Sequence, residues 1–203
     1  MKREYCSNCQ YPQSACICHA VKPTTAVTEV IIMQHPSEVE HAKNTVRLLK
    51  LALPQTQIYV GETAEDFAEL QGYLAAQTRP VLIVYPNDHS NAASEVEADN
   101  KAIIVLIDGT WRKAYRMLQL NPWLLNYPSL HLECDDESQY VIRKAKRSDS
   151  LSTLEAAAYT LASLEPSADI APIFAVFHAM VHHKLTAMPA AVRQRYHSDK
   201  IKG

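Results

Sequence analysis

The chain has 203 residues, the length of one ordinary domain with at most a small appendage. Its 20 basic and 22 acidic residues give a formal net charge of -2, which excludes a wholly basic, histone-like nucleic-acid binder but not a local basic patch. Hydrophobic residues make up 47%, so a core can form. The 4 glycines form neither a Rossmann-type G-x-G-x-x-G nor a P-loop pattern.

The first feature along the chain is a cluster of four cysteines with the spacing C-x2-C-x6-C-x-C: Cys6, Cys9, Cys16 and Cys18. Two closely spaced pairs on a turn-rich loop can direct four sulfurs at one tetrahedral ion, so we predict a zinc-binding knuckle over 1–24. Four protein ligands leave no position for a substrate, which makes the site structural. The alternatives are a flexible tail with free thiols or a labile disulfide in an exported protein.

The cellular location is predicted from two absences. The polar amino terminus is not typical of a signal peptide. The most apolar stretch near the other end, 170–181, is too short to cross a bilayer. We therefore expect a cytoplasmic protein that does not bind membranes, and the sequence indicates no obligate protein partner.

The rest of the chain, 25–203, alternates between strand and helix patterns. In chain order we expect a strand at 27–34, a helix with an apolar stripe from Val39 to Leu53, a strand at 57–60 and a helix at 63–76 capped by Thr63. Two continuous apolar runs at 80–85 and 102–107 predict buried strands, and helices follow from Trp111, Leu154 and Ile170. The order predicts an α/β fold, a mostly parallel sheet with helices on both faces.

Ligands of such sheets bind at the carboxyl ends of the strands, so the loops that follow strands are the candidate site. These loops are His35-Pro36-Ser37-Glu38, Pro86-Asn87-Asp88 and Asp108-Gly109-Thr110-Trp111. The long connection over 135–153 belongs with them because it carries the densest basic run of the chain: Arg143, Lys144, Lys146 and Arg147.

Five segments together resemble the DTW-domain family, which is named for a D-x-T-W motif. They are the cysteine knuckle, His35-Pro36-x-Glu38 with Asn44-Thr45 and Arg47-Leu48-Leu49 downstream, Asp108-Gly109-Thr110-Trp111, Tyr140-x-Ile142-Arg143-Lys144, and Leu151-Ser152-Thr153-x-Glu155-Ala156. The motif alone is weak, but five segments in the family's order are specific. The stretch after about Pro189 has no place in the resemblance.

The resemblance implies a tRNA-uridine aminocarboxypropyltransferase. Such an enzyme transfers the 3-amino-3-carboxypropyl group of S-adenosylmethionine to N3 of a uridine and releases methylthioadenosine; bacterial members act on the variable loop of tRNA. It also implies a fold related to the knotted SPOUT methyltransferases. Two other functions stay open: a SPOUT-type RNA methyltransferase and a non-catalytic zinc-knuckle RNA-binding protein.

The expected catalytic residues are Asp108, Thr110 and Trp111. Uridine N3 must lose a proton before it attacks, and Asp108 is the only carboxylate within the motif, so we expect it to be the base. The alternative is that Asp108 caps the following helix. Trp111 fits stacking on adenine or uracil, or burial in the core.

Other site residues are expected to bind the cofactor or the RNA. Pro86, Gly109, Ser152, Thr153 and Glu155 are assigned to the cofactor, although S-x-x-E is also a helix capping box. The residues assigned to RNA are Asn44, Arg47, Arg143, Lys144, Lys146 and Arg147, and the alternative for these polar and charged residues is a solvated surface.

Overall fold

The computed structural model describes residues 4–41, 43–96, 101–133, 151–190 and 192. One sheet of six strands has the order β2-β1-β5-β3-β6-β4, and all of its neighbouring strands are parallel. The strands are β1 Glu29–Gln34, β2 Gln57–Val60, β3 Val81–Val84, β4 Asn91–Ala92, β5 Ile103–Asp108 and β6 Ser129–His131. The four predicted strands are confirmed. β4 and β6, which are only 2 and 3 residues long, are not predicted from the sequence.

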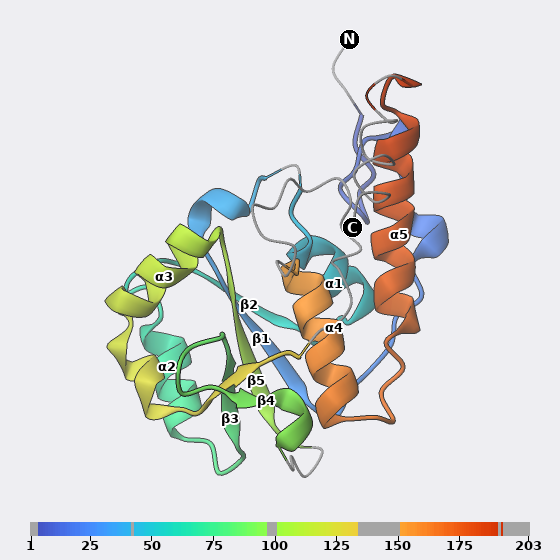
Figure 1. Ribbon diagram of the computed structural model, residues 1–203. Helices are drawn as coiled ribbons and strands as arrows, with labels where there is room; N and C mark the ends of the chain where they lie inside the picture. The colour runs from blue at the N-terminus through green and yellow to red at the C-terminus, as the bar shows by residue number, and fades with distance from the viewer. Residues whose placement is uncertain (1–3, 42, 97–100, 134–150, 191, 193–203) are drawn as a thin grey trace.

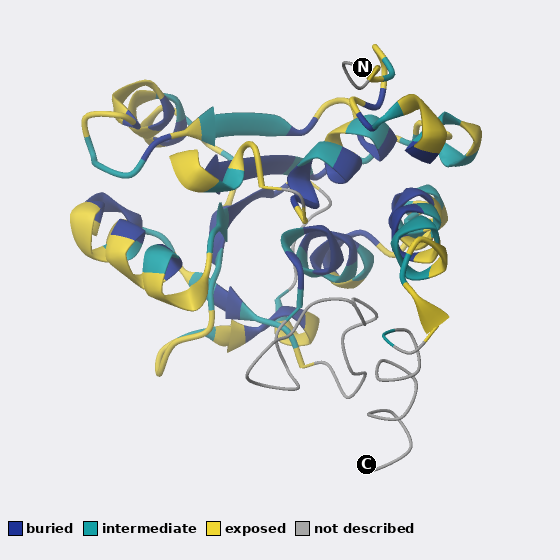
Figure 2. Cartoon of the chain, turned by 90° about the horizontal axis from the view of Figure 1, so that it is seen from above, coloured by how far each residue is buried: buried dark blue, intermediate teal, exposed yellow. Residues whose placement is uncertain are grey.

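Helices cover both faces of this sheet, as predicted (Figure 1). They are α1 Val46–Ala52, α2 Ala68–Ala75, α3 Trp111–Leu120, α4 Thr153–Leu164 and α5 Ala171–Thr186, with short 3-10 turns η1 Gln13–Ala15, η2 Cys18–Ala20, η3 Pro36–Glu38, η4 Ala93–Glu95 and η5 Pro122–Asn126. Two apolar layers result because side chains alternate along each strand. Ile31 and Met33 of β1 pack with α2 and α3, whereas Val30 and Ile32 pack with α1, α4 and α5. Viewed from above, the helices turn their buried sides inward (Figure 2).

The cysteine-bearing segment packs against this second layer. Cys9, Tyr11 and Ile17 are buried in the same cluster as α1 and α5. The knuckle therefore shares its apolar core with the rest of the chain, and the predicted division between 1–24 and 25–203 stays a prediction.

Two predicted helices begin later than their apolar patterns indicate. The helix expected from Val39 begins at Val46, because the Asn44 side-chain oxygen accepts the backbone N–H of Val46 at 2.8 Å and that of Arg47 at 3.3 Å. The helix expected from Thr63 begins at Ala68.

The late start of α2 has a similar cause. The prediction that Thr63 caps this helix is wrong. The Asp66 carboxylate accepts the N–H groups of Glu62 and Thr63, both at 2.9 Å, and closes a turn before the helix starts. These N–H groups lower the pKa of Asp66, and the N–H of Thr63 has the largest effect.

In the part of the chain that is described, no helix has both the length and the apolar character to cross a membrane. The knot implied by the resemblance stays a prediction.

Candidate functional site

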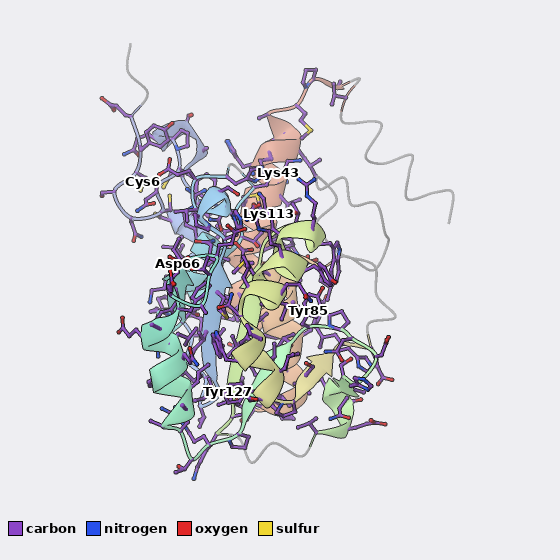
Figure 3. The ribbon with its side chains drawn as sticks, turned by 90° about the vertical axis from the view of Figure 1, so that its left-hand side faces the viewer. Cys6, Lys43, Asp66, Tyr85, Lys113 and Tyr127 are labelled. Carbon is purple, nitrogen blue, oxygen red and sulfur yellow. The ribbon has the colours of Figure 1, made fainter. Side chains whose placement is uncertain are left out.

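A cavity of about 790 Å³ opens at the carboxyl ends of the central strands. Its walls are the loops after β1, β3, β5 and β6 and the first turn of α4, within 38–45, 84–90, 106–114, 130–132 and 151–156. Three loops predicted from the sequence therefore meet around one space. Figure 3 shows that Cys6, Lys43 and Lys113 lie at one end of the molecule, with Tyr127 at the other.

Asp108 ends β5 and lines this cavity. Its carboxylate accepts a hydrogen bond from the Thr153 hydroxyl at 2.5 Å and another from the Gln34 side-chain amide at 2.8 Å. Gln34 is the register partner of Asp108 on the neighbouring strand, so the parallel pairing itself brings the amide to the carboxylate. Three segments far apart in sequence thus hold one acidic group on the cavity wall.

Thr110, not Asp108, caps α3. The Thr110 hydroxyl accepts the backbone N–H of Lys113 at 3.4 Å, and its backbone is extended as a capping residue requires. The alternative in which Asp108 serves as this cap is wrong. The Asp108 carboxylate instead bonds to side chains on β1 and α4.

Gly109 lets the loop after β5 pass close to α3. A Cβ at this position would lie 3.1 Å from Cβ of Lys113 and 3.5 Å from the backbone nitrogen of Ala114, a tight fit that any side chain would disturb. The Lys113 ammonium donates to the Ser37 hydroxyl at 2.6 Å and pairs with the Glu38 carboxylate at 2.7 Å. Lys113 and Glu38 both line the cavity, and this ion pair joins two of its walls.

Trp111 lies on the surface of the cavity and not in the core. Its side chain is 46% exposed, and its ring meets that of Tyr85 edge-on, with centroids 6.0 Å apart and planes at 65°. The residues that α3 buries are Ala114 and Met117. The core alternative for Trp111 is therefore wrong. Pro86 follows Tyr85 on the same wall, as predicted for a residue after β3.

The amino end of α4 carries the predicted capping box. The Ser152 hydroxyl accepts the N–H of Glu155 at 3.3 Å, and the Glu155 carboxylate accepts the N–H of Ser152 at 2.8 Å. Ser152 and Thr153 line the cavity, whereas Glu155 is completely buried and lies behind its wall. Ser152 and Thr153 thus expose the start of α4 to the cavity, and Glu155 stabilises it through the capping box.

The two described residues expected to contact RNA make internal contacts. The Asn44 side-chain amide, on the cavity wall, donates to the carbonyl oxygens of Glu38 and Val39, both at 3.0 Å. The Arg47 guanidinium carbon lies 4.2 Å from the centroid of the Tyr11 ring, a cation–π contact that links α1 to the knuckle. Arg143, Lys144, Lys146 and Arg147 lie outside the described residues.

Sequence reasoning missed a polar pair on the wall formed by β6. Ser90 and His131 line the cavity, with the Ser90 hydroxyl 3.0 Å from Nδ1 of His131. The hydroxyl also donates to the carbonyl oxygen of Asn87 at 2.7 Å. Because the hydroxyl gives its one proton to Asn87, it can accept a hydrogen bond from His131 when Nδ1 carries a proton.

The four cysteines converge on one point, as their spacing predicts. Their sulfurs all lie within 4.8 Å of one another, with Cys6 and Cys18 at 3.6 Å and Cys9 and Cys16 at 3.8 Å. These separations exclude a disulfide of about 2.05 Å. They match the separation of about 3.8 Å between sulfurs that sit about 2.3 Å from one tetrahedral ion.

Two thiols of the cluster have pKa values shifted in opposite directions: although the Cys18 backbone N–H lowers it, hydrogen bonds with the Cys18 and Cys6 thiols raise the pKa of Cys16 to about 12. Backbone N–H groups of Cys9 and Asn8 lower the pKa of the Cys6 thiol to about 6, which favours the thiolate that metals bind. Four sulfurs in this arrangement can hold a metal ion.

Comparison with known proteins shows similarity along most of the chain. The DTW domain model matches residues 3–185. The chain is 32% identical over 171 residues to tRNA-uridine aminocarboxypropyltransferase 2 of Macaca fascicularis, which covers 81% of this chain and 57% of that protein. It is 32% identical over 172 residues to the Drosophila melanogaster protein of the same name, covering 81% and 68%.

A plant relative extends the comparison. The chain is 26% identical over 200 residues to tRNA-uridine aminocarboxypropyltransferase A of Arabidopsis thaliana, covering 83% of this chain and 75% of the relative. The chain spans less than two thirds of the macaque and mouse relatives, 57% of each. The domain match, which includes the knuckle, the cavity and the D-x-T-W turn, shows that this chain belongs to the DTW-domain family.

Proposed function

We propose that this protein transfers the 3-amino-3-carboxypropyl group of S-adenosylmethionine to N3 of a uridine in tRNA, in the variable loop, and releases methylthioadenosine. The observation that carries the proposal is the position of Asp108, held by Thr153 and Gln34 on the wall of a large cavity. The names of its relatives, all tRNA-uridine aminocarboxypropyltransferases, support the same reaction.

The cavity fits S-adenosylmethionine in size and in chemistry. A volume of about 790 Å³ is within the range of small-molecule sites, about 300–1,000 Å³. The amino end of α4, presented by Ser152 and Thr153, carries the positive end of the helix dipole and suits the carboxylate of the methionine moiety. Tyr85, Pro86 and Trp111 offer apolar surface to a base or a sulfonium. S-adenosylmethionine supplies an alkyl carbon activated by a positive sulfur.

Asp108 acts as the base toward uridine. It accepts the proton of N3, so that the nitrogen lone pair can form the new bond to the alkyl carbon while the carbon–sulfur bond breaks. Each carboxylate oxygen can accept more than one hydrogen bond, so accepting from Thr153 and Gln34 is compatible with accepting N3–H as well. Thr110 and Gly109 hold the turn that places Asp108 beside Trp111, whose exposed ring can stack on the uracil.

The RNA is held by polar and basic side chains. We assign Asn44, Arg143, Lys144, Lys146 and Arg147 to this role, as the sequence indicates. Arg47, which is half-buried and stacks on Tyr11, is assigned to the same role from the sequence. Glu155 contributes to the cofactor site by fixing the helix start rather than by contact, since it lies behind the wall.

The knuckle holds zinc in a structural role. Zinc accepts four thiolates in a tetrahedron, and the four sulfurs lie within 4.8 Å of one another, with two pairs at 3.6 and 3.8 Å. The ligands Cys6, Cys9, Cys16 and Cys18 would be fixed in the core through the burial of Cys9 and Tyr11. The metal would thus stabilise the packing of the knuckle against α1 and α5.

The test is product analysis with a matched variant pair. Purified protein is incubated with S-adenosylmethionine and unmodified tRNA, and the nucleosides and the small product are identified by mass spectrometry. We expect an aminocarboxypropyl uridine and methylthioadenosine; S-adenosylhomocysteine would instead identify a methyltransferase, and no product would contradict the proposal. Asp108→Asn should lose turnover by about 100-fold or more, the usual contribution of a general base. Glu69→Gln, an exposed acid on α2, is the control and should retain it.

A further inference from the structure

Helix α3 has an unusual outer face. The helix contains three basic residues, Arg112, Lys113 and Arg116, and no acidic residue, in a chain whose net charge is -2. Lys113 turns toward the cavity, where it meets Ser37 and Glu38. The two arginines are exposed.

Two aromatic residues share this outer face with the arginines. Trp111 is 46% exposed and Tyr115 is 59% exposed. They stand four residues apart, so they are neighbours on the helix surface, and so are Arg112 and Arg116. The face therefore consists of an aromatic row beside a cationic row.

The face begins at the mouth of the cavity. Trp111 lines the cavity and meets Tyr85 edge-on at 6.0 Å. Tyr115 lies one turn further along the helix. Burial raises the pKa of Tyr85, and the nearby Tyr115 raises it further. Figure 3 looks onto this side of the molecule, with Tyr85 beside α3 and Lys113 near its upper end. If one unit of a polymeric substrate enters the cavity, the units next to it in the polymer would therefore contact α3.

We propose that this outer face of α3 is the docking surface for the nucleotide next to the target uridine, with Tyr115 stacking on its base and Arg112 binding its phosphate. The inference rests on the proposed function, since it takes RNA as the substrate. Single-stranded RNA is recognised by aromatic rings that stack on unpaired bases and by cations that bind phosphates. Arg116 is already paired with Glu62 at 2.8 Å, which offsets its charge, so Arg112 makes the phosphate contact.

The test compares RNA affinity with cofactor affinity in single variants. The binding of fluorescein-labelled unmodified tRNA is measured by anisotropy at several salt concentrations, and S-adenosylmethionine binding is measured by calorimetry. Tyr115→Ala should weaken tRNA binding at least about fivefold, the loss expected for one stacked base, while Tyr115→Phe keeps the ring and the affinity. Arg112→Ala should weaken binding and lower the slope of log affinity against log salt by about 0.7 to 1.

The control is Leu125→Ala, which removes a 78% exposed apolar residue from η5, outside the cavity wall. It should bind tRNA normally, and all variants should bind S-adenosylmethionine normally, which shows that they are folded. Unchanged tRNA affinity in Tyr115→Ala and Arg112→Ala would overturn this inference and would point to a protein partner for the face. If the wild-type protein still modified tRNA in that case, the proposed function would stand without the docking surface.

Discussion

The Thr153 hydroxyl donates a 2.5 Å hydrogen bond to the Asp108 carboxylate and thereby joins the amino end of α4 to the carboxyl end of β5. The two residues are 45 positions apart in the chain. One bond thus connects the acid proposed to accept the uridine proton with the helix start proposed to receive the cofactor.

Removing this hydroxyl should impair turnover more than binding. A hydrogen bond to a charged group contributes about 1.5–3 kcal/mol, so Thr153→Val, which keeps the shape, should lower kcat about tenfold or more as Asp108 loses its orientation. Thr153→Ser keeps a donor and should recover most of the rate. Steady-state kinetics with tRNA in excess measure both variants, and a Thr153→Val enzyme with wild-type kcat would contradict the positioning role.

The capping box makes a separate prediction about stability. Ser152→Ala removes the acceptor for the N–H of Glu155 and should lower the free energy of unfolding by about 1 kcal/mol. Glu155→Ala should cost more, because it also leaves the Ser152 N–H without its partner in a fully buried place. Urea denaturation measures both values.

The same variants separate capping from cofactor contact. Glu155→Gln keeps an acceptor oxygen for the Ser152 N–H and removes the negative charge. If Glu155 acts only through the cap, this variant should bind S-adenosylmethionine with nearly wild-type affinity in calorimetry. A large loss of affinity in a variant of normal stability would instead show that its charge acts on the cofactor.

Much of the fold follows from local sequence pattern. The runs at 80–85 and 102–107 become β3 and β5 because a strand buried on both faces needs continuous apolar residues. The short β6 has no such run, and its Leu130 is buried through pairing with β3, a long-range contact that no local pattern records. The helix starts at Val46 and Ala68 are likewise set by Asn44 and Asp66, whose side chains compete for backbone N–H groups.

Site residues could be predicted from the sequence where their residue type and spacing allow few roles. They could not be predicted where their positions depend on contacts between elements far apart in the chain. The cysteine spacing predicts the cluster because four thiols at that spacing have few other uses. The contacts from Gln34 and Lys113 into the site depend on the β1–β5 register and on the close approach at Gly109, which appear only when the chain is folded. A solvated Arg47 was equally compatible with the sequence, since its Tyr11 partner lies on a different element.

Metal content tests the knuckle directly. The purified protein should contain one zinc per chain, and Cys9→Ser should lose it because an alcohol replaces a buried thiolate ligand. Stability should fall by several kcal/mol, on the order of 3 or more, since metal binding contributes to folding. Cys134→Ser, which changes the fifth cysteine of the chain, outside the C-x2-C-x6-C-x-C cluster, is the control and should keep the metal. Atomic absorption and thermal denaturation make the measurements, and a zinc-free, fully stable wild type would contradict the prediction.

Lys184 predicts a dependence of stability on pH. Burial, with Lys43 and Arg47 nearby, lowers the pKa of this α5 lysine from 10.5 to about 8. Between pH 8 and 10.5 the unfolded chain therefore binds more protons at this position than the folded chain does, and its contribution to stability rises with pH. Below pH 8 the charge disfavours the folded state by a constant amount.

Replacing this charge with an apolar chain of similar length should stabilise the protein. Lys184→Met should raise the free energy of unfolding at pH 7 by about 1 kcal/mol, well below the full equivalent of the pKa shift because the side chain keeps some contact with solvent. The gain should shrink as the pH rises above 8 and should vanish only well above pH 10.5, where the lysine is neutral in both states. Lys101→Met changes an exposed lysine and should have no effect at either pH. Urea denaturation of wild type and both variants at pH 7 and pH 10 measures these differences. A Lys184→Met protein that is less stable than wild type at pH 7 would contradict the prediction and show that the charge makes favourable contacts.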